Sequence, residues 1–155
     1  MGYIEDLRAA IGHRPVILTG SVVIICDEDG RILLQERSYP RGKWGLPGGL
    51  MELGESTEET ARREALEETG LTLGRLTLIN VYSGAHYLCK AANGDEWYCV
   101  MIGYYTREFT GTPTVSDGES LSLVWVPPER LPDYDIARTH RALLNDFLRR
   151  DGIII

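Results

Sequence analysis

The sequence predicts an α/β fold in which helices cover a mixed β-sheet. Apolar, β-branched runs typical of strands occur with helical segments before, between and after them, which indicates a layered α/β/α sandwich. Asp-Gly and Asn-Gly pairs between the runs favour hairpins, so the sheet must contain antiparallel pairs. With 155 residues and 43% hydrophobic content, residues 1–155 are expected to form one domain with a sizeable core.

The first elements are a short helix and two strands. Apolar residues at helical spacing predict an amphipathic helix over 3–11 that ends at Gly12. A β-branched run predicts a strand over 16–26, and an Asp-Gly turn leads from it into a second strand over 31–37. We expect these two strands to pair antiparallel. The segment 38–47 is rich in glycine, proline and basic residues and is expected to be a loop.

The element with the clearest boundaries is the helix that follows. Ser56 is a favourable N-cap, and Glu59, three residues later, can complete a capping box. Gly70 stands where a left-handed C-terminal stop belongs. The helix is therefore expected between Ser56 and Gly70.

Strands dominate the second half of the chain, and a helix follows them. The expected elements are extended structure over 72–88, a strand over 96–109, a polar loop over 110–120, a strand over 121–126 and a helix over 136–149. Pro127 ends the last strand, because proline cannot continue a ladder. The apolar stripe of the final helix is expected to lie on the sheet.

Three acids share one face of the helix between Ser56 and Gly70. At 100° per residue, Glu64, Glu67 and Glu68 fall within an arc of about 100°. Like charges at this spacing destabilise a helix, and a hard divalent cation would neutralise them. The alternative is a solvated acidic face, which is the usual meaning of a glutamate-rich helix.

These acids stand at fixed offsets from other residues of one motif. Gly49 is followed after five residues by Glu55, and after seven more by Arg-Glu-Ala-Leu-Glu-Glu-Thr-Gly-Leu, from Arg63 to Leu71. The spacing resembles the Nudix box of the MutT-like Nudix hydrolases. The one departure is Ala65, where the family usually has a bulkier apolar residue.

The resemblance implies a fold and a reaction. It implies the Nudix fold, a mixed, curved sheet between helices, over essentially the whole chain. It also implies hydrolysis of a phosphoanhydride (pyrophosphate) bond in a nucleoside diphosphate linked to another moiety. Nucleoside triphosphates, ADP-ribose and dinucleoside polyphosphates are substrates of this type. The alternative is a catalytically silent Nudix-fold module that senses a nucleotide. Three mutually repelling glutamates argue against that alternative, because a pure binder does not need them.

The resemblance also implies a metal cofactor, Mg²⁺ or Mn²⁺. Its implied ligands are the carboxylates of Glu64, Glu67 and Glu68 and the carbonyl of Gly48. These are hard oxygen donors, which suit both ions. A glycine at position 48 would let the backbone approach the ion closely.

Catalytic roles are implied for the box acids, Arg63 and one loop acid. Arg63 is expected to orient a box glutamate together with Glu55, although an ordinary surface ion pair is the alternative. Glu64 is the first choice as general base, and Glu119, in the loop over 110–120, is the second. A solvated loop glutamate is the alternative for Glu119. Structural roles in the box fall to Gly49, Glu55 and Gly70.

Two residues outside the box are candidates for substrate binding. Arg37, at the end of a predicted strand, stands where the resemblance implies a phosphate-contacting arginine, and a surface salt bridge is its alternative role. Tyr87 lies sixteen residues after Leu71, where the family's subgroups differ. Its ring could stack on a base, but a tyrosine in a strand often simply packs.

Composition bounds the partners and the compartment. The net charge of −7, without any lysine- and arginine-rich run, argues against a nucleic-acid partner and for a small nucleotide substrate. No apolar stretch approaches the ~20 residues that span a bilayer. The three scattered cysteines suit a reducing cytoplasm. The resemblance allows a homodimer, without a sequence signal for one.

Overall fold

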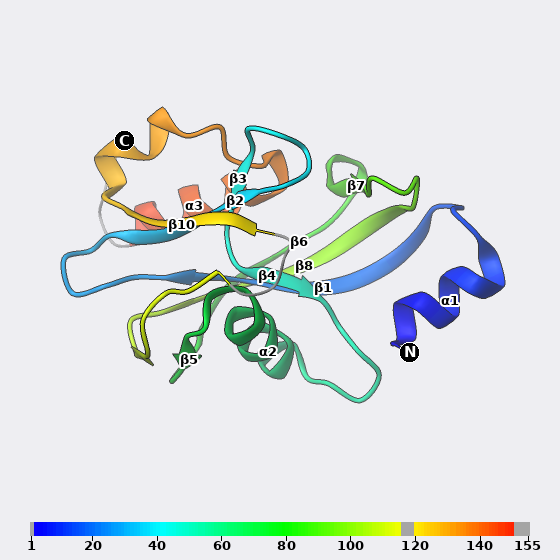
Figure 1. Ribbon diagram of the computed structural model, residues 1–155, viewed down its shortest axis with the longest axis horizontal. Coiled ribbons are helices and arrows are strands. Elements are labelled where there is room, and N and C mark those ends of the chain that lie inside the picture. The colour runs from blue at the N-terminus through cyan, green and yellow to red at the C-terminus, as the bar shows by residue number, and fades with distance from the viewer. Residues whose placement is uncertain (1, 116–119, 151–155) are drawn as a thin grey trace.

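The structure is a computed structural model, and it describes residues 2–115 and 120–150. A curved sheet lies between two helices, α2 (Thr57–Thr69) on one face and α3 (Arg138–Arg150) on the other (Figure 1). A third helix, α1 (Tyr3–Ile11), lies beside the far end of the sheet. The layered α/β prediction is confirmed. No helix in the described ranges is long and apolar enough to cross a membrane.

The main sheet is mixed, as predicted. Its path runs through the strands β4 (Gly48–Leu50), β1 (Val16–Ile25), β8 (Glu96–Thr106) and β6 (Thr77–Tyr82), and β7 (Leu88–Lys90) also pairs with β8. The central pair is parallel, with register from Val16↔Trp97 to Ile25↔Thr106, and the other pairs are antiparallel. The antiparallel contact with β4 places the start of the Nudix box directly beside β1.

Two smaller sheets complete the strand layer. One is formed by β10 (Ser120–Val126), β2 (Ile32–Arg37) and β3 (Trp44–Gly45), and the other by β5 (Thr72–Leu73) and β9 (Phe109–Thr110). All of these pairs are antiparallel. The segment 38–47, expected to be a loop, therefore contains the short strand β3.

The predicted hairpin between 16–26 and 31–37 is wrong. The two strands belong to different sheets and share one antiparallel bridge, Cys26↔Ile32. The reason is that both edges of β1 have other partners. Strand β8 pairs with one edge along the whole length of β1. Strand β4 pairs with the other edge, where the Pro47 carbonyl also accepts a hydrogen bond from the Val23 N–H. The turn residues identified the reversal correctly but could not show these competing partners.

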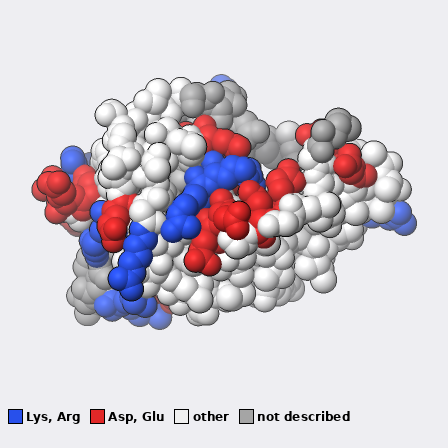
Figure 2. Space-filling model, turned by 90° about the horizontal axis from the view of Figure 1, so that it is seen from below, with Lys and Arg blue, Asp and Glu red and all other residues white. Residues whose placement is uncertain are grey.

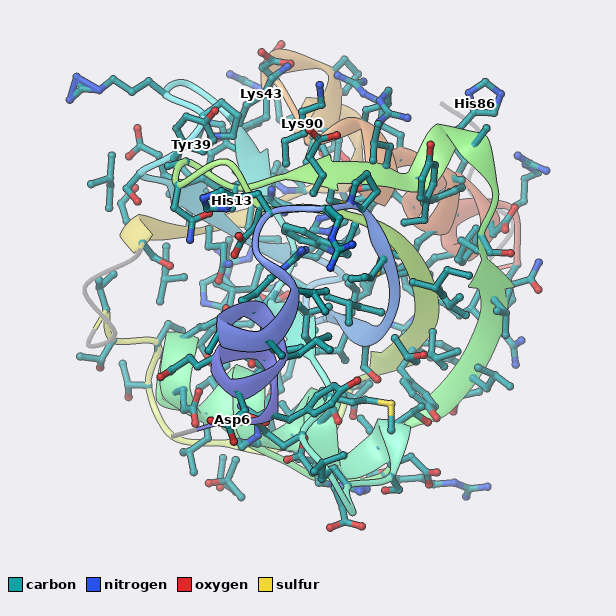
Figure 3. All side chains as sticks on the ribbon, turned by 90° about the vertical axis from the view of Figure 1, so that its right-hand side faces the viewer. Asp6, His13, Tyr39, Lys43, His86 and Lys90 are labelled. Carbon is teal, nitrogen blue, oxygen red and sulfur yellow. The ribbon has the colours of Figure 1, made fainter. Side chains whose placement is uncertain are left out.

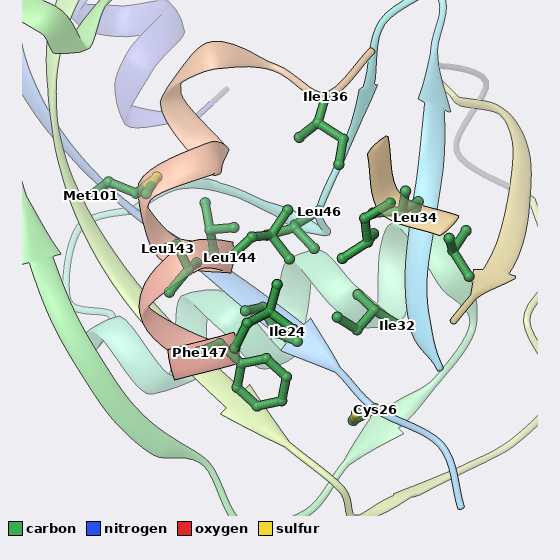
Figure 4. Packing of buried hydrophobic residues seen from close by; sticks show 14 of the residues in the cluster. Ile24, Cys26, Ile32, Leu34, Leu46, Met101, Ile136, Leu143, Leu144 and Phe147 are labelled. Carbon is green, nitrogen blue, oxygen red and sulfur yellow. The ribbon is translucent and has the colours of Figure 1, made fainter. Parts of the chain in front are cut away.

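Hydrophobic clusters occupy both faces of β1, because successive side chains of a strand point to opposite sides. The cluster on the α3 side includes Ile24, Leu46, Leu143 and Phe147 (Figure 4). The cluster on the α2 side consists of Val23, Ile25, Leu33, Ala61, Ala65, Leu71, Leu73 and Tyr104. Burial of each large apolar side chain stabilises the folded state by about 1.5–3 kcal/mol relative to its exposure. The two helices are thereby fixed on opposite faces of one strand.

The helix boundaries follow their predicted caps with one shift. Ser56 Oγ accepts a hydrogen bond from the Glu59 N–H, and the Glu59 carboxylate accepts one from the Ser56 N–H. Gly70 has a left-handed backbone conformation with φ 76°, so α2 begins and ends as predicted. Helix α3 begins at Arg138, two residues later than expected, because Ile136 is bridged to Trp44. Two 3-10 helices, η1 (Ala85–Tyr87) and η2 (Pro128–Asp133), were not predicted.

Candidate active site

Helix α2 is held so that two of its acids, Glu64 and Glu68, face β4. Ala61 and Ala65 are fully buried against the sheet, and Ser21 Oγ donates to the Thr57 carbonyl at 2.7 Å. The small side chain of Ala65, the departure from the family motif, thus packs in the core. This packing fixes the rotation of α2 about its axis, and Glu64 and Glu68 are turned toward the start of the box.

Glu68 and Glu64 both lie against the backbone of the glycine pair. Glu68 is buried, and its Oε1 accepts from the Gly48 N–H at 2.9 Å. A Cβ at Gly49 would overlap the Glu64 carboxylate, whereas a Cβ at Gly48 would overlap the Ser21 carbonyl of β1. The absence of side chains at 48 and 49 is therefore required for two different contacts, one with a carboxylate and one with backbone.

Arg63 joins the box loop to the helix. Its Nε donates to Glu55 Oε2 at 2.6 Å and its Nη1 donates to Glu64 Oε1 at 2.9 Å, while Nη2 donates to the Leu50 carbonyl at 3.0 Å. A longer contact of 3.4 Å reaches Glu67. The structure thus brings Arg63, Glu55 and Glu64 together, and Arg63 contacts more of the acids than its helical position alone suggested.

The Arg63 hydrogen bonds shift the pKa values of this cluster. The bond to Arg63 is the main cause that lowers the pKa of Glu55 to about 2, and bonds from the Glu52 N–H and Thr60 assist. The same pairing raises the pKa of Arg63 above its usual value. Seen from the α2 side, basic and acidic side chains interleave across the face of the molecule (Figure 2). Glu55 is therefore a fixed anion at neutral pH.

The predicted metal ligands are close to one another but do not form a complete cage. Glu67 is 54% exposed, while the side chain of Glu64 is 16% exposed and that of Glu68 is buried. Within 2–115 and 120–150, no three acidic, histidine or cysteine side chains converge closely enough to hold an ion. The donor set still fits a hard divalent cation, because two carboxylates lie against the Gly48–Gly49 backbone and every donor is oxygen. Glu119 lies outside the described residues.

Arg37, at the end of β2, is a half-buried cation. A Cβ at Gly45 would come within 2.8 Å of Arg37 Nε, so the guanidinium lies across this glycine. Burial lowers the pKa of Arg37, and the nearby Glu68 and Cys89 partly oppose this effect. No ion pair to Arg37 occurs among the described residues. The surface salt bridge that was its alternative role is absent from this part of the chain.

The surroundings of Arg37 include a residue that the sequence did not single out. His140, on α3, is buried, with Nδ1 3.1 Å from the Leu46 nitrogen and Nε2 3.4 Å from Arg37 Nη2. The available signal was its spacing, since His140 shares an apolar helical stripe with Leu143, Leu144 and Phe147. An ionisable residue in such a stripe indicates a buried polar contact.

Tyr87 lies in η1 and packs on the α3-side cluster. Its ring centroid is 6.2 Å from that of Tyr82, which donates a hydrogen bond to Asp146. These contacts give Tyr87 a packing role. Figure 3 shows Tyr39 and Lys43, which follow Arg37 in the chain, in the upper part of the molecule together with Lys90.

Comparisons with known proteins agree with the fold and the motif. A sequence model of the NUDIX domain matches residues 18–147. A putative 8-oxo-dGTP diphosphatase of Bacillus subtilis is 37% identical over 130 residues, which are 83% of this chain and 78% of the relative. An 8-oxo-dGDP phosphatase of Homo sapiens is 34% identical over 71% of this chain, but the match spans only 32% of the human protein.

A solved structure gives the same result. The MutT NUDIX hydrolase of Burkholderia pseudomallei superposes with a TM-score of 0.69 at 33% identity, covering 86% of this chain and 98% of that one. The region that the NUDIX model matches, residues 18–147, includes the glycine pair, the whole of α2 and both core clusters except Leu148. This chain therefore belongs to the Nudix family of hydrolases.

Proposed function

We propose that this enzyme hydrolyses the phosphoanhydride chain of a nucleoside triphosphate, with oxidised purine nucleotides such as 8-oxo-dGTP as the first candidates. The observation that carries the proposal is the arrangement of Glu64 and Glu68 against the Gly48–Gly49 backbone, with the Arg37 guanidinium near Glu68. Acidic groups that suit a cation thus lie next to a basic group that suits a phosphate. The names of the two relatives support the choice of nucleotide.

The proposed cofactor is Mg²⁺ or Mn²⁺, held by Glu64, Glu67, Glu68 and the Gly48 carbonyl. When bound, the ion supplies positive charge to the phosphate oxygens and lowers the pKa of a coordinated water. Family members generally use a divalent metal ion, and the oxygen donors of this chain fit one.

The remaining roles are assigned to residues of this chain. Glu64 is the first choice to accept the proton of the attacking water, and Glu119 is the second. Arg63, anchored by Glu55, orients the Glu64 carboxylate through the hydrogen bond at 2.9 Å. Arg37 binds the phosphate chain, since its guanidinium has donors in a fork that matches phosphate.

Substrate binding by Tyr87 remains part of the proposal, at the edge of the site. Its ring is half-buried against the α3-side cluster, so one face could still contact a nucleoside. In the box, Gly49 leaves room for the Glu64 carboxylate, Glu55 anchors Arg63, and Gly70 ends α2.

The proposal is tested with a substrate panel. The protein is incubated with Mg²⁺ or Mn²⁺ and with dGTP, 8-oxo-dGTP, ADP-ribose, nucleotide sugars and dinucleoside polyphosphates, and released phosphate is measured after a coupled phosphatase. We expect turnover of the triphosphates, with the higher kcat/KM for 8-oxo-dGTP. Turnover of another panel member alone would refute the triphosphate assignment. No turnover with either metal would favour the alternative, a catalytically silent nucleotide-sensing module.

The metal assignment is tested separately by thermal unfolding. Millimolar Mg²⁺ should raise Tm, because an ion that binds only the folded state stabilises it by mass action. The double variant Glu67→Gln, Glu68→Gln should lose this response. Glu58→Gln, on the exposed first turn of the same helix, is the matched control and should keep it. A shift retained by the double variant would place the ion elsewhere.

We also propose the cellular setting. No disulfide joins any two of the three cysteines, Cys26, Cys89 and Cys99, which supports a reducing, cytoplasmic location. The net charge of −7 supports a small nucleotide, rather than a nucleic acid, as the partner. One domain over residues 1–155, and a homodimer as an option, complete the proposal, and size-exclusion chromatography with light scattering decides the oligomeric state.

A further inference from the structure

His140 is a polar residue in an otherwise apolar position. It lies in the first turn of α3 with only 6% of its surface exposed, on the same stripe as the core residues Leu143 and Phe147. Burial lowers the pKa of His140 well below its usual value of 6.5, and the neighbouring Arg37 lowers it further. The imidazole is therefore neutral near pH 7, with one protonated and one unprotonated nitrogen.

The bond from Leu46 decides which nitrogen is protonated. The Leu46 N–H points at His140 Nδ1 at 3.1 Å, so Nδ1 must offer its lone pair and the proton resides on Nε2. Backbone bonds hold this region in place, since the Trp44 N–H donates to the Asp135 carbonyl and the Ala137 N–H donates to the Trp44 carbonyl. The tautomer of His140 is thus fixed by the backbone that leads into the Nudix box.

This tautomer presents a donor to Arg37. His140 Nε2 lies 3.4 Å from Arg37 Nη2, and both atoms carry hydrogens, so neither can accept from the other. His140 therefore limits where the guanidinium can lie without neutralising it or using its donors. Gly45 also lies against the guanidinium, because a Cβ at this position would be only 2.8 Å from Arg37 Nε.

We propose that His140 is a positioning residue for the hydrolytic reaction: it confines the Arg37 guanidinium across Gly45, next to the box acids, with its donors directed at the phosphate chain. The inference rests on the proposed function, since it needs Arg37 to bind phosphate. A carboxylate in place of His140 would pair with Arg37 and consume those donors. A neutral ring with its proton on Nε2 limits the position of the guanidinium by contact alone and leaves its donors available for an anionic ligand.

The first test is a double-mutant cycle with steady-state kinetics on the triphosphate substrate. His140→Asn keeps an acceptor near the position of Nδ1 for the Leu46 N–H but removes the ring edge that faces Arg37. We expect KM to rise about tenfold while kcat changes less than about threefold. The reason is that Arg37 would bind the phosphate chain less tightly in the ground state and in the transition state alike. In the Arg37→Ala background, the same substitution should leave KM unchanged, since coupled residues are non-additive.

Controls separate positioning from a general loss of structure. His13→Asn is the same substitution at an exposed histidine, which follows α1 and pairs with Asp95, and it should change neither kinetic constant. Gly45→Ala provides a second route, since it displaces the guanidinium without touching His140. It should reproduce the KM increase with Tm close to that of the wild type.

The outcomes distinguish this inference from the proposed function. An equal loss in kcat/KM from His140→Asn in both backgrounds, or an unchanged KM in Gly45→Ala, would overturn the positioning role. If the wild-type protein turns over neither dGTP nor 8-oxo-dGTP, the proposed function fails. The same double-mutant cycle is then measured on the Kd for 8-oxo-dGTP. A Kd that rises with His140→Asn only when Arg37 is present would still support the inference.

Discussion

Single residues of the box contact different parts of the molecule. The two glycines at 48 and 49 look equivalent in the sequence, yet a side chain at Gly48 would strike the backbone of β1 and one at Gly49 would strike the Glu64 carboxylate. A backbone strand cannot move aside cheaply, whereas a carboxylate can turn away. The first glycine therefore supports the fold, and the second supports the position of an acid.

Gly49→Ala should weaken metal activation rather than stability. The added methyl displaces the Glu64 carboxylate, so the Mg²⁺ concentration for half-maximal activity should rise about tenfold or more. Gly48→Ala is the matched variant and should cost about 1–3 kcal/mol of stability through overpacking. Metal titrations and thermal unfolding of both variants check this. Equal effects of the two substitutions on Tm would contradict it.

Glu55→Gln should reveal the Arg63 bond as a pH-dependent contribution to stability. The folded pKa of Glu55 is about 2, below its usual value of 4.5, so the ionised carboxylate stabilises the folded state above about pH 4.5. That contribution is lost as the pH falls from about 4.5 toward 2. At pH 7 the variant should lose about 1 kcal/mol, and near pH 2, where half of the folded molecules carry a protonated Glu55, most of this difference should be gone.

Urea unfolding at several pH values measures this difference. Glu58→Gln, in the first turn of α2 and outside the Arg63 cluster, is the control and should show no such pH dependence. A Glu55→Gln penalty that stays constant from pH 7 to pH 2 would show that the carboxylate charge does not matter.

At the scale of elements, local signals predicted boundaries better than partners. The capping box at Ser56, the left-handed Gly70 and the turn at Gly12 depend on neighbours in sequence, and the structure confirms each boundary. The pairing of β1 with β2 depended on competitors far along the chain, β4 and β8, and it was wrong. Helix α3 begins two residues after its expected start for the same reason, because Ile136 forms a β-bridge with Trp44 of β3.

The same division applies to the candidate site. The acids on α2 could be found from a helical repeat and a motif, since both are local. His140 meets Arg37 across 103 residues of sequence, and Arg63 reaches its partners by side-chain length rather than by position on the helix. Contacts of this kind follow from tertiary packing, which one sequence without its fold does not specify.

Ser56→Ala should destabilise the protein through α2 alone. The substitution removes the bond at 3.0 Å from the Glu59 N–H to Ser56 Oγ and should cost about 1 kcal/mol. For a protein of this size, Tm should fall by about 2–4 °C. Ser83→Ala, at an exposed position outside the helices and strands, is the control. A Tm equal to that of the control would show that the cap contributes nothing.

At the scale of the whole molecule, β1 is the strand shared by the two hydrophobic clusters. It contributes Ile24 to the α3-side cluster and Val23 and Ile25 to the α2-side cluster, so neither cluster is complete without it. Unfolding of the cluster on either face of β1 would expose apolar side chains of this central strand to water. The described residues should therefore unfold together, in keeping with the proposal of one domain.

Chemical unfolding followed by two probes should give coincident transitions. The three tryptophans lie on different strands, Trp44 on β3, Trp97 on β8 and Trp125 on β10, so fluorescence reports on both larger sheets. Far-UV circular dichroism reports on the helices and strands as a whole. Coincident midpoints are expected for one cooperative unit. A fluorescence midpoint separated from that of circular dichroism would contradict it.

The two glycines that make room for charged groups, Gly45 for Arg37 and Gly49 for Glu64, have a consequence for suppressor genetics. A lost core contact, as in Leu143→Ala, lowers stability, and stabilising changes anywhere in the chain can restore it. A charge displaced by a methyl group is not returned to its place by extra stability. Global suppressors should therefore rescue defects in the core, while defects at Gly45 and Gly49 should yield only to changes in the residues that surround the displaced charge.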